Sequence, residues 1–340
     1  MLAELKRNSH RRSIAALLSS LMLAAGIAAA EPNPALDQQI AEIREVGRFV
    51  SKNALAMLLK IEAQGRAADT ATKAEFLYQL SLAHRGIGKK PEALALAEEL
   101  IAFGKDRHDD VALAKGLMAK GYVLFKMQEL AASHNHLWEA ERVANTTGDM
   151  ALRIAATLAS GASHAEEGNL PEALNKMQTA AAMARQYGRP IQMVMALNAL
   201  ASLYTTLKEY DKGFEAIKEA WPYAEQTKSP GRMATLKNLE YGLAIETNQP
   251  KRALDALLAA LELERKIGAD RMIANSLVDL SDSYLQEHDY RKALSYANAA
   301  IEAARKLNDA AIEATARANI GQAYLGLGRL AEGKRNFELG

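Results

Sequence analysis

Histidine is the residue type in this sequence best suited to acid–base or metal chemistry, and its seven copies are scattered along the chain. His134 and His136 are two residues apart, which places their side chains on different faces of a helix and makes them poor partners for one metal ion. The His-Glu-x-x-His motif is absent, and no acidic pair occurs in a recognisable catalytic motif. The histidines therefore predict neither a metal site nor a catalytic residue.

Gly86-Ile87-Gly88-Lys89 has a faint likeness to a phosphate-binding loop. The segment lacks the full glycine spacing and the Lys-Ser/Thr ending of such a loop, so an ordinary turn between helices is the favoured interpretation. Cysteine is absent, which excludes disulfides, cysteine-based zinc sites and a thiol nucleophile. The residues present predict no enzyme and no cofactor.

The elements that carry these residues are predicted to be helices. The chain is 49% apolar and only 6% aromatic, and runs such as 256–263 and 299–306 consist largely of strong helix formers. Few stretches alternate β-branched residues with a period of two, so strands have little support. The formal net charge of +1 gives no long-range attraction to phosphate backbones, and we expect no nucleic-acid partner.

Residues 1–30 have the pattern of a secretory signal peptide. Met1–Arg12 is basic, Ile14–Ile27 is mostly apolar, and Ala28–Ala30 supplies small residues for cleavage before Glu31. The alternative is an uncleaved membrane anchor, although the apolar stretch is shorter than the about 20 residues that a span requires. The pattern predicts export to the periplasm, or the extracytoplasmic side of a bacterial inner membrane.

Residue types recur every forty positions without an insertion, and we call each set of positions forty residues apart a column. Small residues dominate the first column, which is Ala93, Ser133, Ala173, Gly213, Ala253, Ala293 and Gly333. Seven positions later the column is Leu100, Ala140, Ala180, Ala220, Ala260, Ala300 and Gly340. Twelve positions before the first column it is Ser81, Gly121, Gly161, Ala201, Tyr241, Ser281 and Gly321. Such a fixed period is the sequence signature of a repeat protein.

Turn signals divide each forty-residue unit into two helices. Glycine, asparagine or aspartate ends one helix and proline or a charged residue opens the next, as in Gly88–Ala93 and Gly168–Ala173. We call the two helices of a unit helix A and helix B. Small residues allow the two helices to approach closely, and a column of larger side chains fills the neighbouring groove. That filling column holds Leu137, Met177, Ile217, Leu257 and Phe337, with Ala97 and Ala297 as exceptions.

This pattern resembles the tetratricopeptide repeat. A small residue, an aromatic residue three positions later and two further small positions are clearest in Ser281, Tyr284, Ala293 and Ala300. The unit is longer than the about 34 residues of that family, and HEAT-type helix pairs share the longer period but not the small-residue spacing. The resemblance covers residues 71–340, after a divergent N-terminal helix pair within 31–70. It implies an all-α, right-handed superhelical solenoid of antiparallel helix pairs.

The resemblance also implies that helix A lines a concave groove that binds protein or peptide. The candidate binding residues in two helix-A columns are Tyr78, Tyr122, Asn198, Ser202, Asn238 and Asp282. The amides of Asn198 and Asn238 are suited to pairing with an extended peptide backbone. The alternative is that these residues are merely solvated polar positions. The family's basic clamp for peptide carboxyl termini is not matched, and His84 and His164 are interpreted as packing replacements in a tyrosine column.

The last unit ends at Gly340, within its helix B, so we expect the natural polypeptide to continue. An exported array with more chain to follow resembles the extracytoplasmic sensor region of bacterial membrane signalling proteins of the diguanylate cyclase type. The sequence therefore predicts a periplasmic sensor that is part of a membrane-anchored signal transduction protein. The alternative is a free periplasmic assembly or scaffold protein for envelope or secretion machinery.

Overall fold

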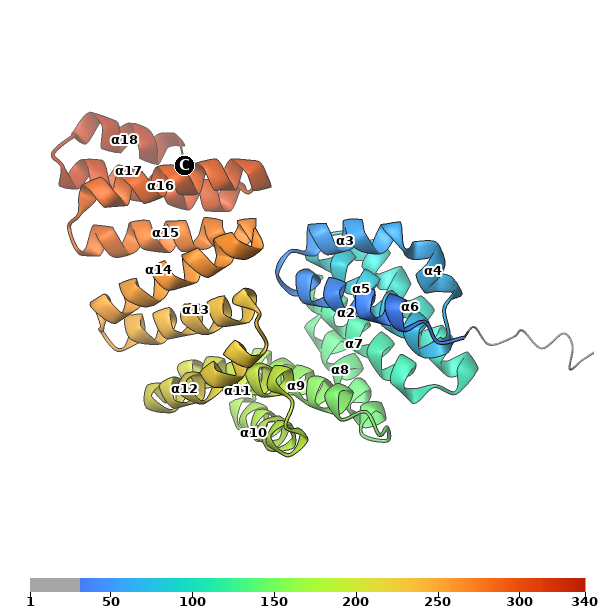
Figure 1. The fold of residues 1–340 in the computed structure, drawn as a ribbon. Helices are drawn as coiled ribbons and strands as arrows, with labels where there is room; N and C mark the ends of the chain where they lie inside the picture. The colour runs from blue at the N-terminus through green and yellow to red at the C-terminus, as the bar shows by residue number, and fades with distance from the viewer. Residues whose placement is uncertain (1–30, 340) are drawn as a thin grey trace, which may run out of the picture.

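The computed structural model describes residues 31–339, which form seventeen α-helices and no strand (Figure 1). The predicted signal peptide, residues 1–30, lies outside this part of the chain. The N-terminal helices are α2 (Pro34–Phe49), α3 (Ser51–Lys60) and α4 (Glu62–Ala67). None of the helices within residues 31–339 has a stretch long and apolar enough to cross a membrane.

Seven helix pairs follow, and we number them as units 1 to 7. The A helices are α5 (Thr70–Gly86), α7 (Asp110–Lys126), α9 (Met150–Glu166), α11 (Pro190–Thr206), α13 (Pro230–Glu246), α15 (Asp270–Gln286) and α17 (Ala310–Gly326). The B helices are α6 (Lys90–Arg107), α8 (Leu130–Ala144), α10 (Leu170–Tyr187), α12 (Tyr210–Gln226), α14 (Pro250–Ile267), α16 (Tyr290–Leu307) and α18 (Leu330–Leu339). Corresponding helices begin forty residues apart, so the predicted right-handed solenoid of antiparallel helix pairs is confirmed.

The small columns lie where helix A meets helix B within a unit. Ser81 Oγ donates a hydrogen bond to the carbonyl oxygen of Ala93 at 2.8 Å, and Ser281 Oγ repeats this contact with Ala293 at 2.9 Å. In unit 2 the roles are exchanged, because Ser133 Oγ donates to the carbonyl oxygen of Gly121 at 2.8 Å. A side chain can reach the opposite backbone only because both positions are small. The small residues therefore set the distance between the two helices.

The filling column behaves as predicted inside the array. Leu137, Met177, Ile217 and Leu257 are all buried, whereas Phe337 is 44% exposed. The difference follows from position, because α18 is the last described helix and its outer side has no described helix packed against it. Stacking on a neighbouring unit is thus what buries this column.

The segment before unit 1 contains three helices where the sequence predicts one pair. Ile61 interrupts the second helix and separates α3 from α4. Leu36, Ile40 and Ile43 of α2 join Leu58 of α3 in one buried cluster with the first residues of unit 1. These helices therefore cover the apolar side of α5.

The array curves so that its two ends lie on opposite sides of the molecule. Figure 1 shows α2–α7 on one side and α13–α18 on the other, joined through α8–α12. The helix that begins the described chain, α2, is thereby placed opposite helices of the middle units. This arrangement brings together residues that are far apart in the sequence.

Candidate functional site

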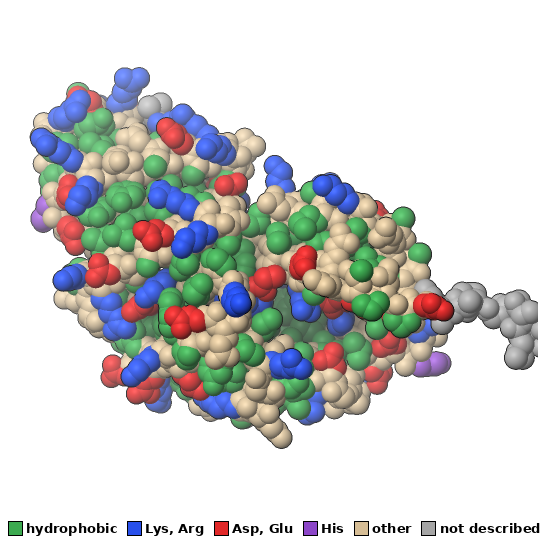
Figure 2. Space-filling model, in the orientation of Figure 1, with side chains coloured by type: hydrophobic (Ala, Val, Ile, Leu, Met, Phe, Trp, Pro, Cys, Tyr) green, Lys and Arg blue, Asp and Glu red, His purple; other side chains and the backbone are tan. Residues whose placement is uncertain are grey.

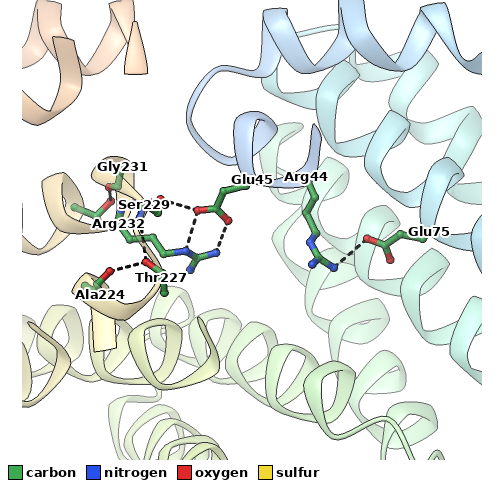
Figure 3. A network of polar contacts seen from close by, with 9 residues as sticks. Arg44, Glu45, Glu75, Ala224, Thr227, Ser229, Gly231 and Arg232 are labelled. Atoms are coloured by element: carbon green, nitrogen blue, oxygen red, sulfur yellow. Dashed lines mark hydrogen bonds and ion pairs between the residues drawn. The ribbon is translucent and has the colours of Figure 1, made fainter. Parts of the chain in front are cut away.

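A hollow lies where the two sides of the solenoid approach each other. Figure 2 shows it near the centre of the molecule, edged by Lys and Arg as well as Asp and Glu side chains. Helix α2 and helix α13 meet beside it (Figure 3). We use the name inner groove for this hollow together with the adjoining surface of units 5 and 6. A basic group of residues beside the hollow and an acidic group in units 5 and 6 are described below.

Helix α2 is joined to α13 by an ion pair between residues 187 positions apart, shown in Figure 3. Arg232 donates to both carboxylate oxygens of Glu45, from Nε at 2.9 Å and from Nη2 at 2.7 Å. Ser229 Oγ donates to the same carboxylate at 2.7 Å. Beside this pair the ring of Phe49 lies against Gly231, where a Cβ atom would come within 2.5 Å of the ring. We call these contacts the α2–α13 clasp.

The clasp depends on an almost fully buried charge. Arg232 is 4% exposed, so its guanidinium requires a negative partner. Burial raises the pKa of Glu45, but the hydrogen bonds from Arg232 and Ser229 and the charges of Arg232 and Arg48 outweigh it, so the pKa is lowered overall. The clasp therefore keeps Glu45 ionised and holds α2 against unit 5.

A second guanidinium next to the clasp has no carboxylate partner within hydrogen-bonding distance in the described structure. Arg48 retains solvent-exposed surface, yet the surrounding protein lowers its pKa through lost hydration, and the positive charge of Arg232 lowers it further. Arg232 itself has a buried Nη1 atom without a hydrogen-bond partner among the described residues. Two neighbouring cations with unused donors favour an anionic ligand.

Two tyrosines from unit 1 and unit 2 complete this basic group. Burial raises the pKa of Tyr78 and that of Tyr122, so both hydroxyls stay protonated and can donate. The guanidinium of Arg85 lies 5.1 Å from the centre of the Tyr122 ring. Nearby, Glu75 forms ion pairs with Lys115 at 2.7 Å and with Arg44 at 3.5 Å. We call Arg48, Arg232, Tyr78 and Tyr122 the basic group of the inner groove.

An acidic group occupies units 5 and 6. Burial raises the pKa of Asp279 to about 6, and the charges of Asp282 and Glu264 add to this effect. Glu264 is fully buried and accepts a hydrogen bond from Asn238 Nδ2 at 2.8 Å, while its Oε2 atom has no partner among the described residues. Crowded, desolvated carboxylates favour a cationic ligand, and shifted pKa values of this kind are typical of functional sites.

Asp279 provides a pH-dependent test of this group. Because its pKa is raised in the folded state, the folded protein binds the proton more tightly than the unfolded chain, and stability is lost as the pH rises through about 6. Replacement of Asp279 with asparagine should therefore raise the free energy of unfolding at pH 7.5 by about 1–2 kcal/mol, allowing for solvent screening. Urea unfolding at pH 5 and pH 7.5 measures the effect, which should shrink at the lower pH.

The exposed residue Asp255 of α14 supplies the control for this measurement. Asp255→Asn should change stability by less than about 0.5 kcal/mol at either pH. An Asp279→Asn variant whose difference from the original protein is the same at both pH values would contradict the assignment.

The six predicted binding residues have different surroundings. Tyr78 and Tyr122 lie together in the basic group, and Asp282 lies close to Asp279 while accepting a hydrogen bond from Gln286 at 2.9 Å. Ser202 is exposed. The Oδ1 atom of Asn198 is buried and has no hydrogen-bond partner among the described residues.

The amide of Asn238 donates a hydrogen bond to Glu264, so one of its N–H groups is already used within the protein. A weak signal in the sequence pointed to Glu264, since every other member of its column in the B helices of units 1 to 6 is small: Gly104, Ala144, Ala184, Ala224 and Ala304. Arg232 is likewise the one charged residue of a column that otherwise holds Thr72, Ala112, Leu152, Gln192, Met272 and Ile312. The repeat pattern was used only through its small and apolar columns, so charged residues within those columns, such as Glu264 and Arg232, were missed.

A separate hollow of about 550 Å³ lies between α13 and α14. Three of its charged side chains pair with one another, because Glu240 contacts Lys237 at 2.8 Å and Arg252 at 2.9 Å. None of the basic-group or acidic-group residues lines it. Because most of its charged side chains are already paired, this hollow is a weaker candidate than the inner groove.

Comparison with known proteins supports the fold assignment. No family model matches the chain. Tetratricopeptide repeat protein 29 of Trypanosoma brucei brucei is 24% identical over 186 residues, which are 55% of this chain and 39% of that protein. The chain thus spans about two fifths of the length of this curated relative.

Two solved structures have a similar architecture over most of the chain. A Rap protein complexed with competence and sporulation factor has a TM-score of 0.62 and 16% identity, and the alignment covers 91% of this chain and 87% of that one. The apo form of the quorum sensor NprR from B. thuringiensis has a TM-score of 0.57 and 10% identity, covering 99% and 93%. The fold is therefore a tetratricopeptide-type solenoid, as the sequence predicts.

Proposed function

We propose that this tetratricopeptide-type solenoid is a non-enzymatic binding scaffold that holds an extended peptide, or an extended segment of a protein, in its inner groove. The observation that carries the proposal is that Arg48, which forms no ion pair in the described structure, lies close enough to Arg232 for the two charges to repel, while Nη1 of Arg232 has no hydrogen-bond partner among the described residues. Unsatisfied donors of this kind are costly unless a ligand completes them. The fold of a Rap protein complexed with competence and sporulation factor supports the same role.

The charges of the groove favour one orientation of the bound ligand. The basic group in α2, α5, α7 and α13 suits an acidic side chain or a terminal carboxylate, and Asp279 and Asp282 in α15 suit a cationic group. Asn198 in α11 has a buried amide oxygen without a partner among the described residues, and rotation of this side chain would let it accept a hydrogen bond from a backbone N–H group of the same ligand. A segment with an anionic end and a cationic end therefore matches the groove in one orientation.

Fluorescence anisotropy on residues 31–340 tests the proposal with labelled twelve-residue peptides. The probes share one composition: one has lysines at its amino end and aspartates at its carboxyl end, the second has the reverse order, and the third has scrambled charges. We expect one ordered peptide to bind best. Arg48→Gln should weaken that binding by about tenfold or more, because a charge-assisted hydrogen bond contributes roughly 1.5–3 kcal/mol.

Exposed Arg291 of α16, in a B helix, provides the control variant, and Arg291→Gln should bind the peptide as the original protein does. Asn198→Ala should weaken binding of all three probes equally, because it removes a backbone contact. Equal affinity for the ordered and scrambled peptides, together with no effect of Arg48→Gln, would refute binding in the inner groove.

The cellular setting is the finer part of the proposal. The signal-peptide pattern of residues 1–30 supports export to the periplasm, where the groove would serve as the sensor part of a larger membrane-anchored signalling protein such as a diguanylate cyclase. A free periplasmic scaffold for envelope or secretion machinery is the second candidate. The downstream reading frame distinguishes them: an apolar span of about 20 residues before an output domain supports the sensor, and an early stop supports the scaffold.

A further inference from the structure

A group of metal-ligating side chains lies outside the inner groove, between unit 2 and unit 3. His134, near the start of α8, faces His164 and Glu167 at the end of α9, with the two imidazole ring centres 4.7 Å apart. His134 Nδ1 lies 3.1 Å from Glu167 Oε2 and 3.1 Å from Ser163 Oγ. One donor atom from each of the two histidines and Glu167 lies within 4.8 Å of the others. Two imidazoles and a carboxylate thus converge on one point.

The repeat pattern shows that stacking does not require these residues. Apart from the last unit, the column of His134 is apolar in every other unit: Leu94, Leu174, Phe214, Leu254 and Leu294. In units 3 and 4 the equivalent positions hold Leu174 and Tyr204, and both pack against the same apolar cluster. Only between units 2 and 3 are both members of this pair histidine. A polar pair has replaced an apolar contact at one place in an otherwise regular array.

One imidazole nitrogen at this place has an unused hydrogen-bonding capacity. The Nδ1 atom of His164 is buried and has no hydrogen-bond partner among the described residues. Leaving such a group without a partner is costly, so its retention requires a compensating interaction. The tyrosine column favours a packing role for His164, but such a role accounts neither for His134 opposite it nor for the carboxylate of Glu167.

We propose that His134, His164 and Glu167 bind a zinc ion, with water as the fourth ligand. Imidazole is a preferred ligand of zinc, and two histidines with one carboxylate form a common zinc ligand set. Zinc–ligand bonds of about 2.0–2.2 Å place tetrahedral donors roughly 3.3–3.5 Å apart, so the present spacing closes by side-chain rotation. Glu167 is exposed, which gives the ion a path from solvent.

Zinc at this position would link helix B of unit 2 to helix A of unit 3. Because an ion bound to the folded state alone raises its stability, zinc would stabilise this one unit interface. The ligands must be deprotonated, so binding would displace the contact between His134 and Glu167 and would weaken at acid pH. This role is independent of peptide binding in the inner groove.

The test is titration of chelator-treated residues 31–340 with zinc chloride, followed by calorimetry and by metal analysis after gel filtration. We expect one equivalent to bind and the Tm to rise with zinc concentration. His134→Leu and His164→Tyr introduce the residues that other units carry at these positions, so they should keep the fold. Each should weaken zinc binding at least tenfold and abolish the zinc-dependent rise in Tm.

Glu167→Gln changes only an exposed side chain, and it should weaken binding roughly tenfold even if the histidine variants fold poorly. Cobalt(II) in place of zinc should give the visible absorption of a tetrahedral site, and this signal should be absent from His134→Leu. His84→Tyr, in the same column as His164, is the control and should bind zinc normally. Absence of stoichiometric binding, or binding that survives all three site variants, would overturn the proposal.

Discussion

Replacement of Glu45 with glutamine is expected to lower the free energy of unfolding by about 2–3 kcal/mol at pH 7.5. The change removes the negative partner of Arg232, which is 4% exposed, and an uncompensated buried charge costs about 3–5 kcal/mol when fully enclosed. We expect a loss below that range because the Glu45 side chain is 35% exposed, so solvent weakens its interaction with Arg232. Urea unfolding measures the loss, and hydrogen exchange should accelerate in α2 and at the start of α13.

The pH dependence of this effect has a definite sign. Because the pKa of Glu45 is lowered in the folded state, its contribution is present above the pKa of an unfolded glutamate and is lost as the pH falls through the folded value. The difference between the original protein and Glu45→Gln should therefore shrink in acid. Unchanged exchange in both α2 and α13 would show that the clasp does not hold these helices together.

Glu42 and Arg232 provide the controls for the clasp. Glu42 is exposed on the same helix, so Glu42→Gln should change stability by less than about 0.5 kcal/mol. Adding Arg232→Met to Glu45→Gln removes the unpaired charge and should recover part of the lost stability. A double-mutant cycle over these substitutions isolates the interaction between the two residues.

Replacement of Phe76 with alanine is expected to cost about 3–5 kcal/mol, the range for a large buried aromatic side chain. Phe76 is completely buried, and its ring lies where a Cβ atom on Gly65 of α4 would come within 2.4 Å. The substitution leaves a cavity between α4 and α5 that the backbone of Gly65 cannot fill. Chemical denaturation measures the loss, and hydrogen exchange should show the largest change in α3, α4 and α5.

Phe337 in α18 is the matched control, because it is 44% exposed. Phe337→Ala should cost less than about 1 kcal/mol and leave exchange in the N-terminal helices unchanged. A Phe76→Ala protein with nearly unchanged stability would mean that α2–α4 contribute little to the folded array, contrary to the buried cluster they share with α5.

The fold was predictable because its determinants are local and repeated. Ala93, Ala173 and Ala293 mark the same helix contact three times, and each is fully or almost fully buried as the small columns imply. Forty-residue spacing alone places the helix starts, since neighbouring units interact in the same way. The split at Ile61 was not predictable, because the N-terminal helices occur once and lie outside the repeat pattern.

The candidate site was predictable only in part, because the repeat pattern predicts only those residues that belong to its columns. The repeat predicts that Tyr78 and Tyr122 lie on the same side of their A helices, and in the structure these two residues lie together. The partner of Arg232 does not follow, because Glu45 lies outside the period and 187 residues away. His134 carried a local signal, since it interrupts a column of leucine and phenylalanine, but only the structure shows that His164 faces it.

Stacking alone does not determine the number of units in an array of equal units, because each added unit presents the same surface to the next. Here Arg232 lies in the A helix four units after the first one, so its ion pair with Glu45 forms only when that number of units separates the two residues. Duplication or loss of one copy would keep every local contact and yet leave both charges without partners. The clasp thus acts as a check on copy number, which regular stacking by itself cannot provide.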